Sequence, residues 1–137
     1  MIQNGSSPHR VLLLGLEGTV DGKLSQILSQ QNHSVWSRPF PPTSRSVEVS
    51  LRLAVQSGAE VICCSADPER YLPLVEAVQQ KRLRVPVVVV STEPNTSEWL
   101  DAIENGAWDY FGMPFESTHI QHVLENAIKC CNRTELN

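Results

Sequence analysis

The sequence predicts an α/β fold, a doubly wound sheet of five parallel strands in the order 2-1-3-4-5 with helices on both faces. Three short apolar runs, 10–14, 60–65 and 87–91, lack the polar alternation of a half-exposed strand. Such continuous runs are typical of strands buried on both faces. Segments with apolar residues at helical spacing separate these runs, and strands that alternate with helices favour a parallel sheet. Five such strands fit the doubly wound order.

The first half of the chain contains the more irregular elements. Arg10–Leu14 stops at Gly15, as a buried strand does before a turn. Thr43 or Ser44 offers a hydroxyl cap to a helix that ends at Gly58. Two further elements are expected: a helix over Gly22–Gln31, on the spacing of Leu24, Ile27 and Leu28, and a short edge strand over His33–Arg38, which stops at Pro39, Pro41 and Pro42.

The second half is more regular. Glu60–Ser65 is a buried strand, and Pro68 starts a helix with Leu72, Val75 and Val78 on its inner face. After Pro86 the run Val87–Ser91 forms a strand rich in β-branched residues. The remaining elements are a helix over Thr96–Asn105 with Gly106 as its C-cap, a strand over Trp108–Phe111 and an amphipathic helix over Ser117–Cys130.

Length and charge restrict the class of protein. The chain has 137 residues, of which 41% are hydrophobic, and a net charge of −4. This fits one compact domain and gives no reason to expect contact with nucleic acid or a membrane. Residues 1–9 lack the basic start and apolar run of a signal peptide, so we expect a cytoplasmic protein. We place a disordered leader at 1–9, the domain at 10–131, and a tail or the start of a linker at 132–137.

The four cysteines form two neighbouring pairs, Cys63-Cys64 and Cys130-Cys131. Neighbours on a strand point to opposite faces, so Cys63 and Cys64 share no ligand and form no disulfide with each other. Burial raises a thiol pKa, which argues against a redox sensor. With no Cys-x-x-Cys spacing, we expect no metal and no cofactor.

A motif near the end of the chain carries a family resemblance. The segment Asn105-Gly-Ala-Trp-Asp-Tyr-Phe-Gly-Met-Pro-Phe115, with the strand Val85–Ser91 before it, resembles the last third of a response-regulator receiver (CheY-like) domain. The resemblance spans Arg10 to Lys129 and implies a flavodoxin-like sheet whose functional crevice lies at the carboxyl ends of the strands.

The same resemblance implies that the phosphorylation chemistry is missing. The acidic pair that would hold Mg²⁺ aligns with Gly15 and Leu16, and the phospho-accepting aspartate aligns with Ser65, which cannot form an acyl phosphate. Met113 stands in the position of the lysine. The positions that are retained are the hydroxyl after the fourth strand, Ser91, and the aromatic switch, Tyr110.

Two carboxylates remain near the expected crevice. Glu17 and Asp67 are either solvated loop residues, with Asp67 capping the helix after Pro68, or an improvised cation site. We favour the first interpretation. A two-residue register shift that makes Asp67 the phospho-acceptor leaves Gly15, Leu16 and Met113 unexplained. The four histidines offer no hydrolase triad, because none has a partner that the sequence places.

These observations favour a non-catalytic signalling module, a pseudo-receiver that is not an enzyme. The resemblance implies that it binds a protein partner or dimerises through the face of helix 4, strand 5 and helix 5, and regulates an attached output domain such as a transcriptional regulator. The candidate face residues are Glu98, Trp99, Asp101, Ala102, Tyr110, Phe111, Ile120, Gln121 and Glu125. Trp99 is either an exposed anchor or packs inward with Leu100 and Ile103, and the second is favoured. We expect Tyr110 to rest in one rotamer, uncoupled from Ser91.

An alternative function belongs to another class. Replacement of acidic residues by Gly15, Leu16, Ser65 and Met113 leaves a more neutral crevice, which suits a small uncharged ligand. The alternative is therefore a small-ligand-binding flavodoxin-like domain.

Overall fold

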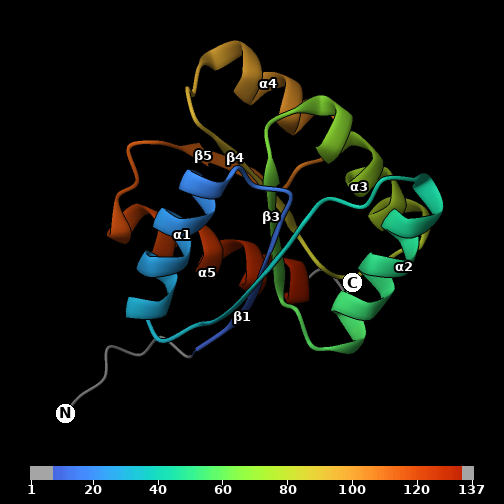
Figure 1. The fold of residues 1–137 in the computed structure, drawn as a ribbon, viewed down its shortest axis with the longest axis horizontal. Coiled ribbons are helices and arrows are strands. Elements are labelled where there is room, and N and C mark those ends of the chain that lie inside the picture. Colours follow the sequence, from blue (N-terminus) through green and yellow to red (C-terminus); the bar gives the residue numbers. More distant parts are fainter. Residues whose placement is uncertain (1–7, 134–137) are drawn as a thin grey trace.

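The computed structural model describes residues 8–133, with side chains to Cys131. It confirms the predicted sheet: five parallel strands in the order β2-β1-β3-β4-β5 (Figure 1). The elements are β1 (Arg10–Leu14), α1 (Gly18–Gln30), β2 (Ser34–Arg38), α2 (Ser44–Gln56), β3 (Val61–Ser65), α3 (Pro68–Gln80), β4 (Val87–Ser91), α4 (Thr96–Glu104), β5 (Asp109–Gly112) and α5 (Ser117–Arg133).

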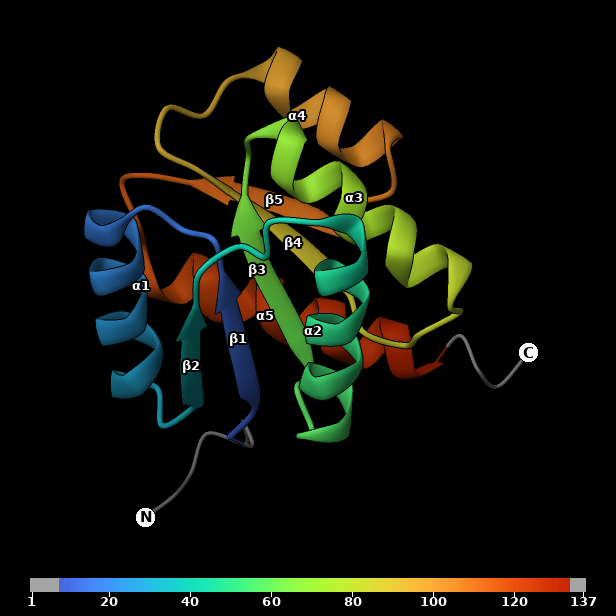
Figure 2. The same ribbon diagram turned by 45° about the vertical axis from the view of Figure 1, so that its right-hand side comes forward.

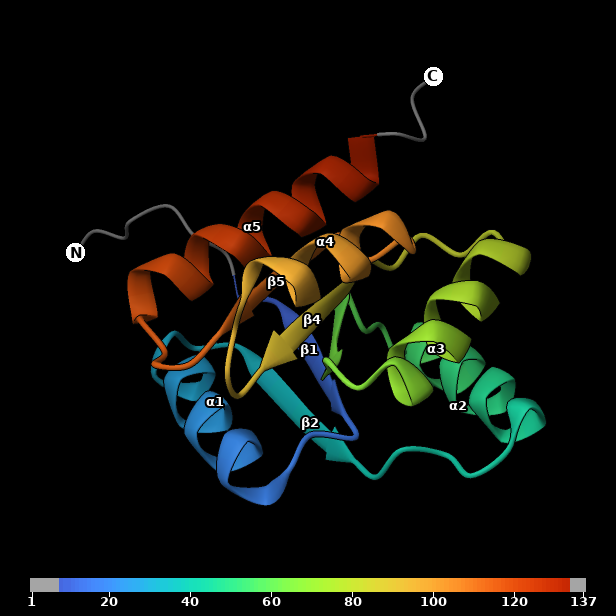
Figure 3. The same cartoon turned by 90° about the horizontal axis from the view of Figure 1, so that it is seen from above.

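Two hydrophobic clusters lie on opposite faces of the sheet. One joins α1 and α5 through Leu24, Leu28, Ile120 and Leu124. The other joins α2, α3 and α4 through Leu51, Tyr71, Leu74 and Ala102. Alternate residues of β3 enter the two clusters, so that Cys63 lies in the first and Cys64 in the second, both with no exposed surface. The helices that cover each face can be followed in Figures 2 and 3.

Burial raises the pKa of Cys63 and Cys64 to about 12. The prediction that these residues pack as small apolar groups in a buried strand is confirmed, and their lack of redox reactivity stays a prediction. No helix within residues 8–133 is long and apolar enough to cross a membrane.

Three details differ from the sequence prediction. The first helix starts at Gly18 rather than Gly22, because the Glu17 carboxylate caps it and Val20 extends its buried stripe by one turn. On α3 the inner face is turned by one residue, so Tyr71 and Leu74 are buried while Leu72 is 37% exposed. The last helix runs to Arg133 rather than to Cys130.

His9, placed by the sequence analysis in a disordered leader, instead packs at the amino end of the sheet. Its backbone N–H donates to His33 Nδ1 at 3.0 Å, and the two rings stack with centroids 5.5 Å apart. His9 Nδ1 lies 3.3 Å from Glu60 Oε2, and His9 Nε2 lies 3.4 Å from Glu125 Oε2 without hydrogen-bond geometry. The first seven residues of the expected leader lie outside the described part of the chain.

His33 completes this cluster from a buried position. Because its Nδ1 accepts from His9, its proton sits on Nε2, which donates to Gln121 Oε1 at 3.2 Å. Burial is the main cause that lowers the pKa of His33 below its ordinary value of 6.5, with the positive potential of His9 acting in the same direction. The Gln121 hydrogen bond and the Glu125 and Glu60 carboxylates oppose the shift without reversing it.

We therefore predict that His33 contributes to acid sensitivity. Its folded pKa is depressed, so below 6.5 the unfolded chain binds more protons and the free energy of unfolding falls as the pH decreases. Between pH 7.5 and 5.5, the melting temperature of a His33→Gln variant should fall less than that of the wild type. The control is His122→Gln on the exposed side of α5. Equal acid sensitivity of the wild type and His33→Gln would contradict the prediction.

Candidate functional site at the carboxyl ends of the strands

The parallel strands bring their carboxyl ends to one edge of the sheet, where a cavity of about 300 Å³ opens. It is lined by Leu16, Glu17, Val20, Ser65, Ala66, Asp67, Pro68, Val90, Ser91, Thr92 and Glu98. The structure thus brings together five of the predicted site positions: Leu16, Glu17, Ser65, Asp67 and Ser91. Gly15 and Met113 do not line the cavity. Other side chains cover Gly15, and Met113 packs into the hydrophobic cluster of α1 and α5.

Gly15 is covered by side chains from β2–α2 and α3. Its φ of +72° is in the left-handed region, and a Cβ at this position would lie 2.8 Å from Cβ of Phe40. Arg70 donates from its guanidinium to the Gly15 carbonyl and stacks over the Phe40 ring at 5.9 Å. A carboxylate in place of Gly15 would therefore require Phe40 to move.

Met113 lies on the opposite face. It packs half-buried against the α1–α5 cluster, in the same group as Leu16 and Phe115, and its backbone N–H donates to the Ser91 carbonyl. The thioether side chain is an apolar filler here, and it brings no charge to the cavity.

The remaining carboxylates at β1 and β3 act as helix caps. Glu17 Oε1 accepts from Val20 N at 3.4 Å, and Asp67 Oδ1 accepts from Glu69 N at 3.0 Å. Ser65 Oγ in turn accepts from Asp67 N at 3.1 Å. The predicted capping role of Asp67 is confirmed, and β3 ends at Ser65, paired with Val90, so Asp67 lies beyond the strand.

Glu98 is the residue that sequence reasoning placed wrongly. It was assigned to the outer face of the fourth helix, but its side chain turns into the cavity and lies between two hydroxyls. Ser91 Oγ donates to Glu98 Oε1 at 2.5 Å, and Tyr110 OH donates to the same oxygen at 2.6 Å. We call these three side chains the Glu98 clamp.

The loop between β4 and α4 holds the clamp in place. Asn95 caps α4 by accepting from Glu98 N at 2.8 Å, and its own N–H donates to Tyr110 OH at 3.1 Å. Ser91 Oγ also accepts from Glu93 N at 3.1 Å. Burial, followed by the hydrogen bond to Glu98, raises the pKa of Tyr110, which therefore remains a donor at neutral pH. Asn95-x-x-Glu98 has the spacing of a capping box, the one sequence signal that marks Glu98 as special.

The clamp bears on the two switch positions. Tyr110 and Ser91 are bonded to one carboxylate oxygen in this structure, and the expectation that Tyr110 rests in one rotamer and does not move with Ser91 stays a prediction. The crevice was also expected to be neutral, whereas Glu17, Asp67 and Glu98 line it. Among residues 8–133 there is nevertheless no group of three or more histidine, cysteine, aspartate or glutamate side chains placed to hold a metal ion.

Several predicted interface residues are not available on the surface. Phe111 is 3% exposed and Ile120 is fully buried, because both belong to the α1–α5 cluster. Gln121 is half-buried and bonds to His33 and Glu125. By contrast, Trp99 and Leu100 are each 43% exposed on α4, so the favoured inward packing of Trp99 is wrong. The one buried residue of α4 is Ala102.

No protein-family model matches the sequence, and no curated protein sequence matches it either. Solved structures do match this chain. The chain is similar to NtrX from Brucella abortus, crystallised with ADP, with a TM-score of 0.76 and 19% identity over 94% of this chain. It spans 28% of the NtrX chain.

Single-domain structures match over almost their whole length. A response-regulator receiver domain from Clostridium thermocellum has a TM-score of 0.69 and 17% identity, covering 93% of this chain and 98% of its own. A putative response regulator from Chloroflexus aurantiacus has a TM-score of 0.73 and 20% identity, covering 90% and 99%. The protein has the fold of response-regulator receiver domains.

Proposed function

We propose that this chain is a receiver-fold signalling module that takes no phosphoryl group and acts through contact with another protein chain. The observation that carries the proposal is the Glu98 clamp. Ser91, which stands at the hydroxyl position of the receiver resemblance, and Tyr110, which stands at its aromatic switch position, both donate to a carboxylate of the chain itself.

The charges around the crevice support the same proposal. Phosphoryl transfer depends on cations placed around the transferring group. Here the lining contains three carboxylates, from Glu17, Asp67 and Glu98, and no lysine or arginine. An incoming phosphoryl group or its mimic would meet negative charge, and Ser65 offers a hydroxyl that already accepts a backbone hydrogen bond.

The acidic lining also argues against the alternative function. A small uncharged ligand gains little from a crevice walled by carboxylates, and the Ser91 hydroxyl in the lining already donates to Glu98. We therefore do not propose this crevice as a ligand site.

The contact surface that we propose is centred on α4. Trp99 and Leu100 are adjacent and both largely exposed on a helix that buries one residue. Trp is enriched among residues that dominate binding energy at protein interfaces. The clamp ties this helix to β4 and β5, so the surface is presented in one orientation. The partner is a second copy of the chain or another protein, and an attached output domain is the element that it would regulate.

The first prediction from the proposed function concerns phosphorylation. Amide NMR spectra of the ¹⁵N-labelled chain should show no saturable shifts with Mg²⁺ and beryllofluoride, because the crevice lacks an acceptor aspartate and a lysine. The NtrC4 receiver domain, whose structure was solved in a beryllofluoride-activated dimeric form, is the positive control. Saturable shifts at Ser65, Asp67 and Ser91 would overturn the proposal.

The second prediction concerns the clamp. Glu98→Ala should lower the free energy of unfolding by about 1–3 kcal/mol, since it leaves the buried Ser91 hydroxyl without its acceptor. The exposed Glu104→Ala on the same helix should change it by less than about 0.5 kcal/mol. Urea denaturation measures both. An equal loss in the free energy of unfolding of the two variants would show that the clamp does not stabilise the fold.

The third prediction concerns the α4 surface. Replacement of both Trp99 and Leu100 by alanine should abolish concentration-dependent dimerisation in sedimentation velocity runs while leaving the circular dichroism spectrum unchanged. Leu72→Ala is the matched control, since Leu72 is an exposed leucine on a different helix. Dimerisation that survives in the double variant would exclude this surface. A wild-type chain that stays monomeric would exclude the homodimer and leave the surface for a different protein.

A further inference from the structure

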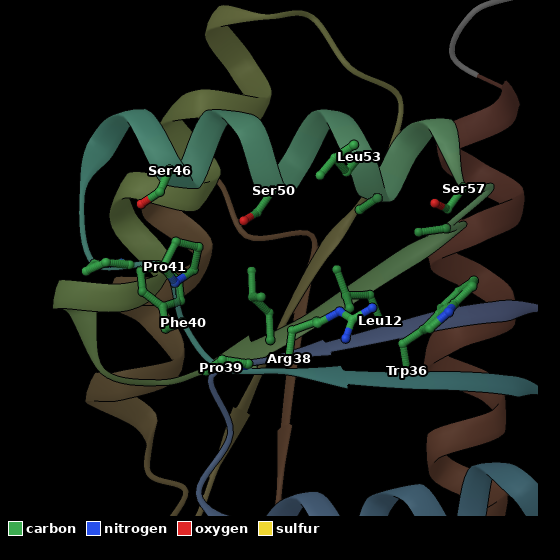
Figure 4. Close-up of a pocket in the computed structure, with 14 residues that line it drawn as sticks. Leu12, Trp36, Arg38, Pro39, Phe40, Pro41, Ser46, Ser50, Leu53 and Ser57 are labelled. Carbon is green, nitrogen blue, oxygen red and sulfur yellow. The ribbon is translucent and has the colours of Figure 1, made fainter.

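A second cavity, larger than the crevice, lies between α2 and the β1–β2 edge of the sheet (Figure 4). It has a volume of about 510 Å³ and shares no lining residue with the crevice. We call it the α2 groove. Its lining residues are Leu12, Leu14, Trp36, Arg38, Pro39, Phe40, Pro41, Pro42, Ser46, Ser50, Leu53, Ala54, Ser57 and Ala59.

The groove follows from the sequence of the helix above it. On α2, the large residues Val47 and Leu51 are buried in the core. The side of the helix over β2 carries small residues instead, Ser46, Ser50 and Ala54, which are spaced by four and therefore share one face. These short side chains do not reach the strand below, and a hollow remains.

The floor is built from two cross-strand pairs. Leu12 pairs with Trp36, and Leu14 with Arg38. Because residues two apart on a strand point to the same side, Trp36 and Arg38 both face α2. Three prolines and Phe40 form the wall at one end. The side chain of Leu53, 57% exposed, lies at the rim and adds apolar surface that nothing in the described chain covers.

Arg38 is the single charged residue in this lining. No hydrogen bond or ion pair within residues 8–133 engages its guanidinium, which is exposed beside apolar walls. Figure 4 shows the guanidinium reaching up from the strand toward α2, beside Leu12. A cation with unused donors in an apolar groove favours an anion there, since a charge-assisted hydrogen bond is stronger where water is partly excluded.

We propose that the α2 groove binds a small amphipathic monoanion, a carboxylate or sulfonate with an apolar body. The volume is that of a small-molecule site, and mostly apolar walls with a few polar groups are its usual make-up. The apolar body lies along Leu12, Trp36 and Leu53, and the anionic group pairs with Arg38. Aromatic and aliphatic acids share this chemistry. The proposal does not depend on the α4 surface or on the Glu98 clamp.

The test compares matched acids and neutral analogues. Naphthalene-2-carboxylate and its amide form the aromatic arm, and decanoate and decanol, below their aggregation limits, form the aliphatic arm. The full chain is titrated with each while amide NMR shifts are followed. We expect saturable shifts confined to residues 36–57 and the strand β1, with the acid of at least one arm binding more tightly than its neutral analogue. The arm whose acid binds more tightly shows whether an aromatic or an aliphatic body fits the groove.

Substitutions then assign the groups. Arg38→Gln should weaken binding of the acid about tenfold, the size of one charge-assisted hydrogen bond, and leave the neutral analogue unchanged. Arg45→Gln, an exposed arginine of α2 outside the groove, is the control and should have no effect. Ser50→Leu, which fills the hollow with an apolar side chain, should abolish binding of acid and analogue alike.

Three results would overturn the proposal. One is the absence of shifts with all four compounds. Another is an equal loss of acid binding in Arg38→Gln and Arg45→Gln, which indicates attraction to net charge alone. The last is a set of shifts centred on Trp99 and Leu100 that persists in Ser50→Leu, which indicates adsorption to exposed apolar residues.

Discussion

The constraint on which the rest of the structure depends is the burial of β3 and β4 on both faces. All five residues of β4 are buried, and β3 sends Cys63 to one cluster and Cys64 to the other. Strands of this kind need helices on both sides, and right-handed crossovers then align all carboxyl ends at one edge. The positions of Leu16, Ser65 and Ser91 around one crevice follow from this packing, whatever chemistry the residues themselves provide.

The crevice combines two converging hydroxyl groups with a lining that contains no lysine or arginine. Ser91 and Tyr110 converge on one point, as a shared anion requires, and the anion is the Glu98 carboxylate. A carboxylate held by two hydroxyl donors needs no counter-cation, which agrees with a lining that contains no lysine or arginine. The clamp also joins α4 to β4 and β5. The orientation of Trp99 on α4 therefore depends on the hydrogen bonds that Glu98 makes at the crevice.

The sequence predicted the sheet, its order and most element bounds, because buried strands and capped helices have strong local patterns. It predicted less well which side chains face the core, because that depends on tertiary packing. Leu72 and Leu74 are both compatible with the inner face of α3, and the sheet selects Leu74. Phe111 and Ile120 were assigned to an interface surface, and the packing of α5 over β5 places them in the core. Glu98 and the His9–His33 pair involve residues distant in sequence, for which periodicity carries no signal.

The two cavities have opposite electrostatic character, and both follow from what covers the strands. At the carboxyl ends, helix caps bring carboxylates to the lining, since acidic side chains are favoured at helix N-termini. Along the β2 edge, a helix with small residues leaves apolar strand surface open beside one arginine. An anion is therefore disfavoured in the crevice at the carboxyl ends of the strands and favoured in the α2 groove beside the edge strand β2. In the α2 groove, a positive charge and a cavity with the volume of a small-molecule site occur together.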